Sequence, residues 1–432
     1  MSCPRIAVVL ALLVWLPVTM AAPTGKRLTL DEALATAEAA HPDLRLAEAE
    51  RAVALAEQES ASSRGDLAVS LEAGLRRARP STDTVGSLSD NTLKLNARKN
   101  LYDFGRTARA EQAAKATVEA REAGLLDARE RLRIEVMTRF FDVLAADMQF
   151  TADNEYMAVA YVNADNGRDR FKVGQISSVE LAELEHRYQD LLARRNASQA
   201  RARIARAGLA NAMNQPGQLP AELEDPKLAT NSRALPEYET LLTVLEEHNS
   251  RLRAQLALLD ASRQRMEALR AENAPFLDAE LEAADYSREA TTRDNLRAGV
   301  VLTWPLYQGR RVSAQLAREQ AQFHRLQAEA DKLRMELAEA FLDVWSEIDQ
   351  LQRSVRAAAR KQVEFRDLAL EKARGEYEVE LKTNLGDAMA ATMEAKLRER
   401  KTEYRLALAF ARLEAMLGRP LESIGKEKGQ AK

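Results

Sequence analysis

The sequence predicts a mainly α-helical chain with a small β part, built as two tandem repeats. Three observations lead to this fold class. The 432 residues contain only 17 Gly and 12 Pro, so long stretches rich in Ala, Leu, Glu and Arg run without a helix breaker. Two pairs of short segments alternate apolar and polar residues instead, as strands do. Motifs of the first half also recur, in the same order, in the second half.

The charges are numerous but balanced, and this excludes one class of partner. The chain has 63 Lys and Arg against 66 Asp and Glu, for a net charge of −3. A nucleic-acid-binding protein needs a basic surface, so we expect no nucleic-acid partner. Interleaved charges of both signs are typical of water-facing helices that carry ion pairs.

Residues 1–21 have the pattern of a cleaved signal peptide for export. An apolar run over residues 6–16 follows a basic residue, and Thr19 and Ala21 supply the small residues of a cleavage site after Ala21. The run is too short for a typical transmembrane helix, although a retained membrane anchor is the alternative. The only cysteine, Cys3, lies in this segment, so we expect neither a disulfide nor a lipoprotein anchor in the mature chain.

The duplication rests on several motif pairs whose order is the same in both halves. The pairs, first copy and then second, are LRIE at 132–135 with LRME at 333–336, FFDV at 140–143 with FLDV at 341–344, LYDFGR at 101–106 with LYQGR at 306–310, and NQP at 214–216 with GRP at 418–420. Chance could supply one such match, but not an ordered series. We therefore expect repeat 1 over residues 22–216, a linker or equatorial segment over 217–236, repeat 2 over 237–420 and a tail over 421–432.

Each repeat is expected to begin with a helix. In repeat 1, Thr29 and Asp31 are suited to the first turn, and the helix should run to about Ser63 and end at Gly65. Segments of period two follow, and they predict strands over 67–78 and 91–102 in repeat 1 and over 276–285 and 295–305 in repeat 2. Strands of this length, about ten residues, match tilted transmembrane β-strands.

After each strand pair the period becomes helical. Apolar residues recur at steps of seven, as in Ile134, Phe141 and Met148 of repeat 1 and in Leu337, Val344 and Leu351 of repeat 2. Such steps predict helices that pack side by side in a long antiparallel coiled coil, on the order of 90 Å in length. We expect the chain to turn at residues 172–177 and 378–383, with returning helices over 178–213 and 385–417.

Four strands of this kind would be unstable alone in a membrane, because their edges would expose unpaired backbone groups. Closure into a barrel would require strands from other copies of the chain, hence a homo-oligomer in contact with membrane lipid. The polar face would then line a wet lumen; its predicted residues are Glu72, Lys94, Arg98, Glu280, Glu282 and Arg297. The aromatic residues Tyr102, Phe276, Trp304 and Tyr307 flank the strands as an interfacial girdle would. The alternative is a soluble strand pair packed on helices.

Nothing in the sequence favours catalysis. The four histidines are scattered on predicted helices without the paired spacing of a helical metal motif. Carboxylates alternate with Arg and Lys, as on solvated helix faces. We therefore predict no enzyme activity, no metal site and no cofactor.

The order of these motifs resembles the TolC-like outer membrane factors, the outer membrane efflux proteins. The matching segments are LTLDEAL at 28–34, HPDL at 41–44, LYDFGR at 101–106 and RFKVG at 170–174, followed by Ser177 and Glu180. The resemblance implies a trimer that closes a 12-strand outer-membrane β-barrel on a periplasmic α-helical barrel. It also implies docking on a periplasmic adaptor (membrane fusion) protein and an inner-membrane transporter.

The resemblance further assigns roles to the two helix-turn-helix tips. The adaptor-docking residues would be Val173, Gly174, Gln175, Ile176, Ser177, Val379, Glu380, Leu381, Lys382 and Thr383, and the candidates for an entrance gate are Glu180, Glu378 and Asp387. The second tip departs from the family, because Glu380 stands at the glycine position and Gly386 at the acidic gate position. An ordinary coiled-coil turn is the alternative for either loop.

The function implied is that of an outer-membrane channel in a tripartite efflux pump or a type I secretion system, with a large periplasmic part. A drug, a metal ion, a polypeptide or a metabolite would all be possible cargoes. The competing hypothesis is a periplasmic coiled-coil adaptor or scaffold without a pore. Adaptors usually have a single helical hairpin, whereas this sequence has two repeats, each with a strand pair.

Overall fold

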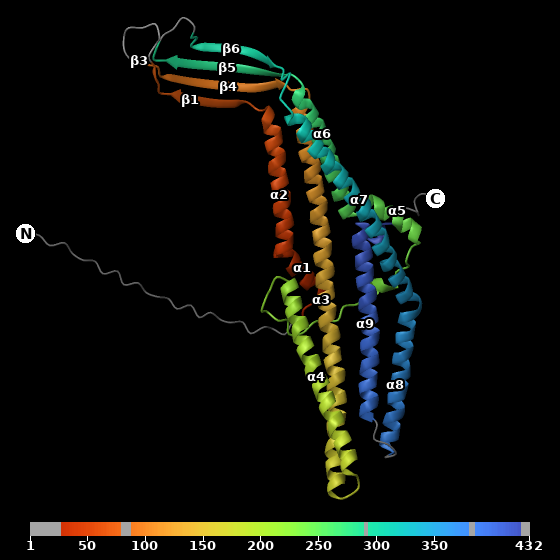
Figure 1. The fold of residues 1–432 in the computed structure, drawn as a ribbon. Coiled ribbons are helices and arrows are strands. Elements are labelled where there is room, and N and C mark those ends of the chain that lie inside the picture. Colours follow the sequence, from red (N-terminus) through yellow and green to blue (C-terminus); the bar gives the residue numbers. More distant parts are fainter. Residues whose placement is uncertain (1–26, 79–87, 289–292, 380–384, 425–432) are drawn as a thin grey trace, which may run out of the picture.

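The computed structural model describes residues 27–78, 88–288, 293–379 and 385–424. These residues form one elongated molecule, with a curved sheet at one end and long helices that run away from it (Figure 1). The predicted fold class is confirmed: the chain is mainly helical, with a small β part, and its two halves repeat the same order of elements. The predicted signal peptide over residues 1–21 and the part of the tail beyond residue 424 lie outside the described residues.

The two repeats share the order of their main helices and strands, while a short strand pair in repeat 1 and a π-helical segment in repeat 2 have no counterpart among the described residues. Repeat 1 contains α1 (Leu30–Ala40), α2 (Pro42–Ser62), a 3₁₀ turn (Ser63–Gly65), β1 (Ala68–Gly74), β2 (Arg77–Ala78), β3 (Leu88–Ser89), β4 (Thr92–Tyr102), α3 (Arg106–Lys172) and α4 (Ser178–Ala212). Repeat 2 contains α5 (Tyr238–His248), α6 (Ser250–Arg270), a 3₁₀ turn (Ala271–Asn273), β5 (Phe276–Tyr286), β6 (Leu296–Thr303), α7 (Arg311–Gln350), a π-helical segment (Leu351–Val355), α8 (Arg356–Glu378) and α9 (Leu385–Leu417). Because α1 and α5 each have 11 residues and α2 and α6 each have 21, the likeness extends to element length.

The single opening helix expected in repeat 1 is wrong, because the structure divides it into α1 and α2. Pro42 has no backbone N–H and disfavours helical geometry in the residue before it, so His41 is extended (φ −63°, ψ 135°). The start is as expected: Thr29 and Glu32 form a capping box, in which each side chain accepts from the other's backbone N–H. In repeat 2, Asn249 makes the corresponding break and caps α6 by accepting from the Leu252 N–H at 2.9 Å.

Each repeat ends at a residue with left-handed backbone that touches the end of its own first helix. Asn214 (φ 56°) follows α4, and its Nδ2 donates to the carbonyl of Ala40 at 3.0 Å. Gly418 (φ 66°) follows α9 and lies so close to His248 that a Cβ on it would be 2.5 Å from the carbonyl oxygen of that residue. A left-handed residue is a common way to end a helix.

The two long descending helices differ in one respect. In repeat 1, α3 is an unbroken helix of 67 residues that starts after Gly105, whose φ is 84°. In repeat 2 the helix is interrupted by the π-helical segment between α7 and α8. There, Gln352 Nε2 donates to the carbonyls of Arg233 at 2.8 Å and Asn231 at 3.2 Å, so the wider turn is tied to the linker.

The core consists of two apolar clusters at the level where the linker crosses the helices. One cluster belongs mainly to repeat 1 and includes Phe140 and Phe141, with the Phe141 ring stacked on Tyr404 of α9 at 4.7 Å between centroids. The other belongs to repeat 2 and includes Phe341 and Phe410. The predicted seven-residue steps lie partly in these clusters. Phe141, Leu337 and Leu351 are buried, whereas Ile134, Met148 and Val344 are half-buried.

The linker is held against α9 and the π-helical segment by polar contacts. Asn231, fully buried, donates from Nδ2 to Glu403 Oε2 at 2.8 Å, and Arg356 Nε donates to Glu403 Oε1 at 2.6 Å. Burial acts to raise the pKa of the Glu403 carboxyl, but the hydrogen bonds from Asn231 and Arg356 outweigh it, so that pKa is lowered. Trp345 Nε1 donates to the carbonyl of Pro236 at 3.0 Å, which fixes the other end of the linker.

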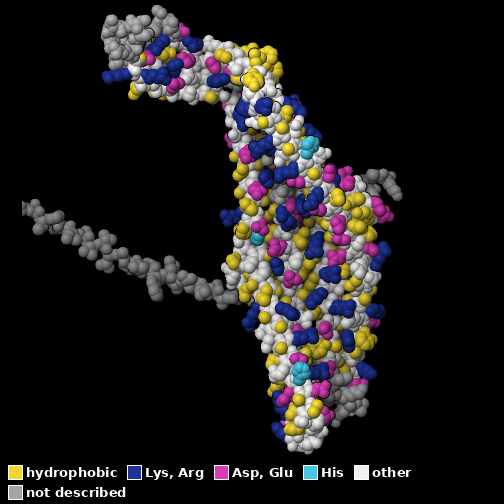
Figure 2. Space-filling model, viewed as in Figure 1, with side chains coloured by type: hydrophobic (Ala, Val, Ile, Leu, Met, Phe, Trp, Pro, Cys, Tyr) yellow, Lys and Arg dark blue, Asp and Glu magenta, His cyan; other side chains and the backbone are white. Residues whose placement is uncertain are grey.

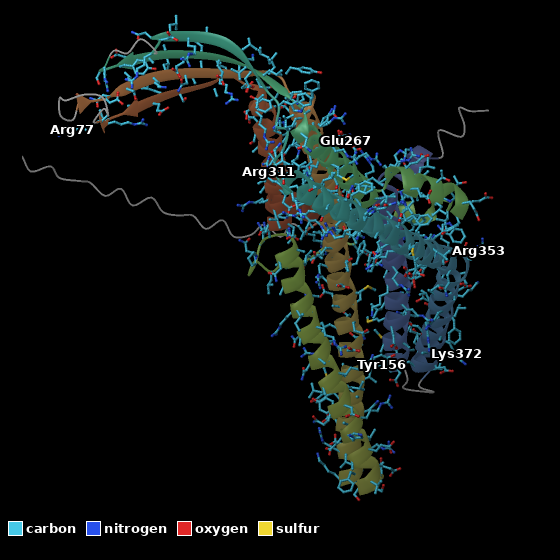
Figure 3. The ribbon with its side chains drawn as sticks, turned by 45° about the horizontal axis from the view of Figure 1, so that its top comes forward. Arg77, Tyr156, Glu267, Arg311, Arg353 and Lys372 are labelled. Atoms are coloured by element: carbon cyan, nitrogen blue, oxygen red, sulfur yellow. The ribbon has the colours of Figure 1, made fainter. Side chains whose placement is uncertain are left out.

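The four main strands form one antiparallel sheet in the order β1-β4-β5-β6. The repeats therefore meet along β4 and β5, while β1 and β6 are the two edges. A pair of two-residue strands, β2 and β3, extends the first hairpin. Figure 3 shows Arg77 at the end of the sheet away from the helices and Glu267 and Arg311 near the opposite end.

The contact between Gly418 and His248 gives a stability prediction. Gly418→Ala should lower the free energy of unfolding by roughly 2–4 kcal/mol, because the added Cβ meets backbone and the left-handed φ is strained. Gly217→Ala is the matched control: φ is also positive there, but no atom lies within 4 Å of the added Cβ, so a loss of about 1 kcal/mol is expected. Thermal or denaturant unfolding measures both. Equal losses would contradict the close approach of the two elements.

Candidate functional site

The sheet has one polar face, and the six residues predicted for a lumen all lie on it. The register places Ser70, Asn96, Glu282 and Arg297 in one row across the four strands, and it places Arg98 opposite Glu280 and Glu72 opposite Lys94. Lys94 Nζ lies 3.6 Å from Glu282 Oε2, and Arg98 Nε lies 3.6 Å from Glu280 Oε1. A hollow of about 440 Å³ opens over this face.

One buried acidic residue on this face was not among the predicted lumen residues. Asp278, only 3% exposed, accepts hydrogen bonds from Arg98 Nε at 3.0 Å and from Asn100 Nδ2 at 2.9 Å. Its position was visible in the period-two pattern, since it has the same parity as Glu280 and Glu282. The network ties β4 of repeat 1 to β5 of repeat 2 across the seam of the sheet.

The opposite face of the sheet is apolar and bare. Leu71, Leu95, Val300 and their neighbours alternate with the polar residues, and Leu71 and Leu296 are each 67% exposed. Monomeric water-soluble proteins rarely leave so large an apolar surface uncovered. The polar and apolar faces are thus separated strand by strand, with one side suited to water and the other to an apolar surrounding.

Exposed aromatic residues surround the end of the sheet that joins the helices. Tyr102, Phe104, Trp304 and Tyr307 are all at least half exposed, and Tyr307 is 86% exposed. Phe276 lies in the same region, with the guanidinium of Arg106 5.2 Å from its ring centroid. Figure 2 shows an apolar patch at this junction, next to helices whose surface carries interleaved charges of both signs.

The first tip is a tight turn that leads into a capped helix. Gly174 has φ 73°, and its N–H donates to the Phe171 carbonyl at 2.9 Å. Ser177 caps α4: its Oγ accepts from the Glu180 N–H at 3.2 Å, and Glu180 Oε2 accepts from the Ser177 N–H at 2.7 Å. Hydrogen bonds from the backbone and side chain of Ser177 hold the pKa of the Glu180 carboxyl below its usual value. Val173 and Gln175 of this turn are exposed, and Ile176 is half-buried.

The second tip is described only in part. Glu380, Leu381, Lys382 and Thr383 lie outside the described residues, whereas Val379 ends α8 and is exposed. The two remaining gate candidates, Glu378 and Asp387, differ in their ion-pair contacts. Among the described residues Glu378 has no ion-pair partner, whereas Asp387, in the first turn of α9, has its Oδ1 3.9 Å from Arg187 Nη2 of α4.

A ladder of polar contacts continues upward from Asp387 between the returning helices. Seven residues along each helix, Arg194 of α4 lies 3.9 Å from Glu394 of α9. Two residues of α3 join this second level: Tyr156 donates to Glu394 Oε2 at 3.1 Å, and the buried Asp153 lies 2.8 Å from Arg194 Nε. Figure 3 shows Tyr156 on α3 at this height. Repeats 1 and 2 are therefore linked through charged groups as well as through their apolar clusters.

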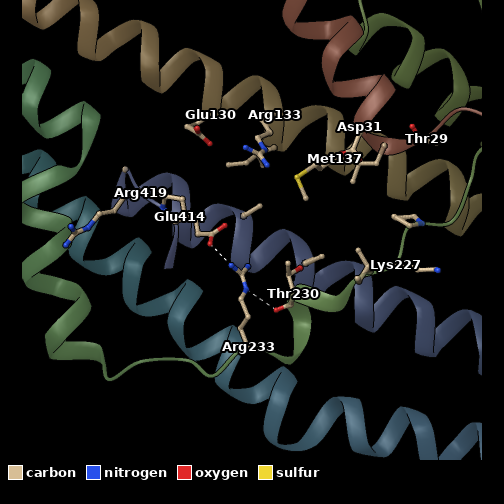
Figure 4. A pocket seen from close by; sticks show the side chains of 18 of the residues that line it. Thr29, Asp31, Glu130, Arg133, Met137, Lys227, Thr230, Arg233, Glu414 and Arg419 are labelled. Carbon is tan, nitrogen blue, oxygen red and sulfur yellow. Dashed lines mark hydrogen bonds and ion pairs between the residues drawn. The ribbon is translucent and has the colours of Figure 1, made fainter. Parts of the chain in front are cut away.

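A second hollow, of about 640 Å³, lies at the level of the linker between α3 and α9 (Figure 4). Arg233 crosses its edge, donating to Glu414 Oε1 at 2.7 Å and to the Thr230 carbonyl at 3.1 Å. Its lining combines further charged residues, such as Glu130 and Arg133, with apolar ones.

The described part of the chain was compared with the requirements of a metal site and of a membrane-spanning helix. There, no group of three or more His, Cys, Asp or Glu residues is close enough to bind a metal ion. His41 caps α2, while His186 lies 3.5 Å from Asp190 on the same helix. In the same described ranges no helix is long and apolar enough to cross a membrane.

Comparison with known proteins gives one family match and two sequence relatives. Residues 33–215 match the family model of the outer membrane efflux proteins. The proteases secretion protein PrtF of Dickeya chrysanthemi is 26% identical over 274 residues, which cover 59% of this chain and 57% of the relative. The outer membrane efflux protein BepC of Brucella suis is 23% identical over 314 residues, which cover 71% and 67% of the two chains. This chain thus spans little more than half the length of the first relative.

Solved structures extend the likeness to both repeats. The outer membrane protein VceC of Vibrio cholerae superimposes with a TM-score of 0.73 at 17% identity, covering 90% of this chain and 96% of that one. The outer membrane channel CmeC of Campylobacter jejuni gives a TM-score of 0.74 at 15% identity, covering 93% and 88%. At such low identity the agreement is one of fold. The chain is therefore similar in sequence to the outer membrane efflux proteins over residues 33–215, and similar in fold to solved outer membrane channels over both repeats.

Proposed function

We propose that this protein is the outer-membrane channel of a tripartite efflux pump or a type I secretion system. Three copies would join their sheets into a 12-strand barrel, on which the long helices form a periplasmic tunnel. The observation that carries the proposal is the open sheet, with its apolar face, its polar face and two unpaired edge strands.

The order of the strands supports closure between copies. The sheet has an even number of antiparallel strands, so β6 of one copy and β1 of the next would also meet antiparallel. That pairing would satisfy the backbone groups of both edges, each of which costs several kcal/mol if left unpaired in lipid. A single hairpin or one isolated sheet could not satisfy them.

The two faces of the sheet indicate which one would point outward in the closed barrel. With Leu71, Leu95 and Val300 outside, the apolar band would meet lipid, and the hollow over Glu282 and Arg297 would become part of the lumen. The exposed aromatic residues at the helical end would lie at the membrane–water interface. Charges of both signs would line the lumen, because Lys94 and Arg98 alternate with glutamates there.

The tips are proposed as the adaptor-docking surface, and the lower ends of α4 and α9 as the entrance gate. At the first tip, Val173, Gly174 and Gln175 are exposed and Ile176 is half-buried, and the absence of a side chain on Gly174 would allow close approach by a partner. Asp387 is paired with Arg187, so it would act by holding α9 against α4. Gly386, the residue before Asp387, lies so close to Val159 of α3 that a Cβ on it would not fit. The glycine therefore allows α9 to pack closely on α3.

The sheet argues against the competing function, because an adaptor or scaffold without a pore would not need a sheet with an exposed apolar face and unpaired edges.

The relatives bear on the cargo. The relatives' names include one protease secretion protein and one efflux protein. The proposal therefore covers both polypeptide secretion and efflux of smaller compounds, through an inner-membrane transporter and its adaptor.

Location and assembly test the proposal most directly. The exported protein should sediment with outer membranes and behave as a trimer in detergent, because the sheet edges need partners. Analytical ultracentrifugation and membrane fractionation measure this. A monomer that stays soluble and fully folded without detergent would contradict the channel proposal and favour the scaffold.

The two faces of the sheet should respond differently to charge. Leu71→Arg or Leu95→Arg should destabilise the assembled barrel by roughly 2–4 kcal/mol, since either would place a charge in lipid near the midplane. Glu72→Gln, on the next residue but the other face, should leave trimer yield unchanged. Trimer recovery from the outer membrane is the readout. The same tolerance on both faces would contradict the assignment.

The first tip should be needed for transport but not for assembly. Gly174→Pro should abolish export with trimer yield and membrane insertion intact, because proline cannot adopt φ 73° and lacks the N–H that donates to Phe171. Gly375→Ala, at a helical glycine of α8 with open space around it, serves as the control and should export normally. If export survives Gly174→Pro, the tip is only a structural turn.

A further inference from the structure

The ladder between α4 and α9 has a third level at which its charge pattern changes. On α4 the arginines recur at steps of seven, as Arg187, Arg194 and Arg201, and the facing residues of α9 recur in the same way, as Asp387, Glu394 and Lys401. The first two levels are ion pairs, at 3.9 Å each. At the third level, α9 has Lys401 where the two lower levels have an acidic residue, whereas α4 again has an arginine, Arg201.

The third level surrounds a hollow of about 250 Å³ between three helices. Arg201 and Lys401 line it together with Asp142, Ala145, Ala146 and Gln149 of α3 and Ser198 of α4. Among the described residues neither Arg201 nor Lys401 has an ion-pair partner, in contrast to the arginines at the two levels below. Both cations are exposed to solvent, and small alanine side chains form part of the wall of the hollow that they line.

We infer that Arg201 and Lys401 bind a small inorganic oxyanion, of the phosphate or sulfate class, that bridges α4 and α9. Two cations on neighbouring helices repel each other, whereas an anion between them converts repulsion into two attractions. The planar guanidinium of Arg201 can donate two parallel hydrogen bonds to an oxyanion, and the Lys401 ammonium supplies a point charge. The anion would take the place that Glu394 and Asp387 hold at the lower levels.

The size and charge of the hollow limit the ligand. Pockets for drug-sized molecules usually measure about 300–1,000 Å³, so this one suits a small ion with a few waters. Asp142 adds one negative charge to the two positive ones, and burial raises the pKa of its carboxyl, with Arg139 acting in the opposite sense. This carboxylate would compete with a bound anion, so it should weaken affinity and not supply it.

The experiment uses the full-length chain, purified in detergent, with inorganic phosphate as the probe. The melting temperature is measured as phosphate replaces chloride at constant ionic strength, and affinity is measured by calorimetry. We expect phosphate to raise the melting temperature of the wild type. Arg201→Gln and Lys401→Gln should each abolish the rise, while Arg203→Gln, an exposed arginine of α4 outside the hollow, should retain it.

Two further variants separate the anion site from a purely structural role. Lys401→Glu restores the acid of the lower levels, so it should raise the melting temperature in chloride and remove the response to phosphate. Asp142→Asn removes the competing carboxylate and should tighten phosphate binding roughly threefold to fivefold. If Asp142 were instead the counter-ion of Arg201 and Lys401, Asp142→Asn would lower the melting temperature without improving affinity.

Three results would overturn the inference: no phosphate response in the wild type, a response that survives Arg201→Gln and Lys401→Gln, or a loss of affinity in Asp142→Asn. The test rests on the helices and their charges and needs no transport activity. Its failure would therefore leave the proposed channel untouched, and failure of the channel proposal would not remove a measured anion site.

Discussion

The constraint on which the structure depends is the unpaired backbone along β1 and β6. A sheet with two free edges and an exposed apolar face is stable only when its edges are paired and that face is covered. If identical sheets join edge to edge in a closed ring, the edges become paired, and the apolar faces form one continuous outer surface that lipid can cover. The position of the long helices follows, since β4 and β6 both run toward the helical end of the sheet and continue into α3 and α7.

The two repeats share one order of main elements, but the contacts that they make are not equivalent. The unbroken α3 packs against α2 and α4 of its own repeat and against α6 and α9 of the other. Repeat 2 has an interrupted helix in the equivalent place, and its π-helical segment is hydrogen-bonded to the linker. Arg98 with Asp278 in the sheet, Phe141 with Tyr404 at the linker level and Arg187 with Asp387 near the tip join the repeats at three heights. Each pair lies far apart in the sequence.

Features set by local chemistry could be predicted from the sequence. The period-two strands, the Thr29 and Ser177 caps and the positive φ of Gly174 depend on residues within a few positions of each other. Pro42 was equally visible, and its break of the first helix could have been expected. The ladder between α4 and α9 could not, because the partner of an arginine at seven-residue spacing depends on which helix packs beside it. The role of Asp278 required the strand register across the repeat boundary.

The π-helical segment shifts the phase of the buried stripe in repeat 2. Above it, the stripe follows Leu337 and Leu351 at multiples of seven; below it, the buried residues are Ala359 and Ala373, one position later than that series. Phe365, which continues the upper series, is 60% exposed. One extra residue rotates an α-helix by about 100°, and the wide turn absorbs that rotation. Removing one residue from Leu351–Val355 would restore a regular helix with Ala359 and Ala373 still facing their present neighbour, whereas winding all five residues into a regular α-helix would rotate the lower half of α8 by about 100°. The irregular turn is therefore what keeps the two ends of this helix facing the same neighbour.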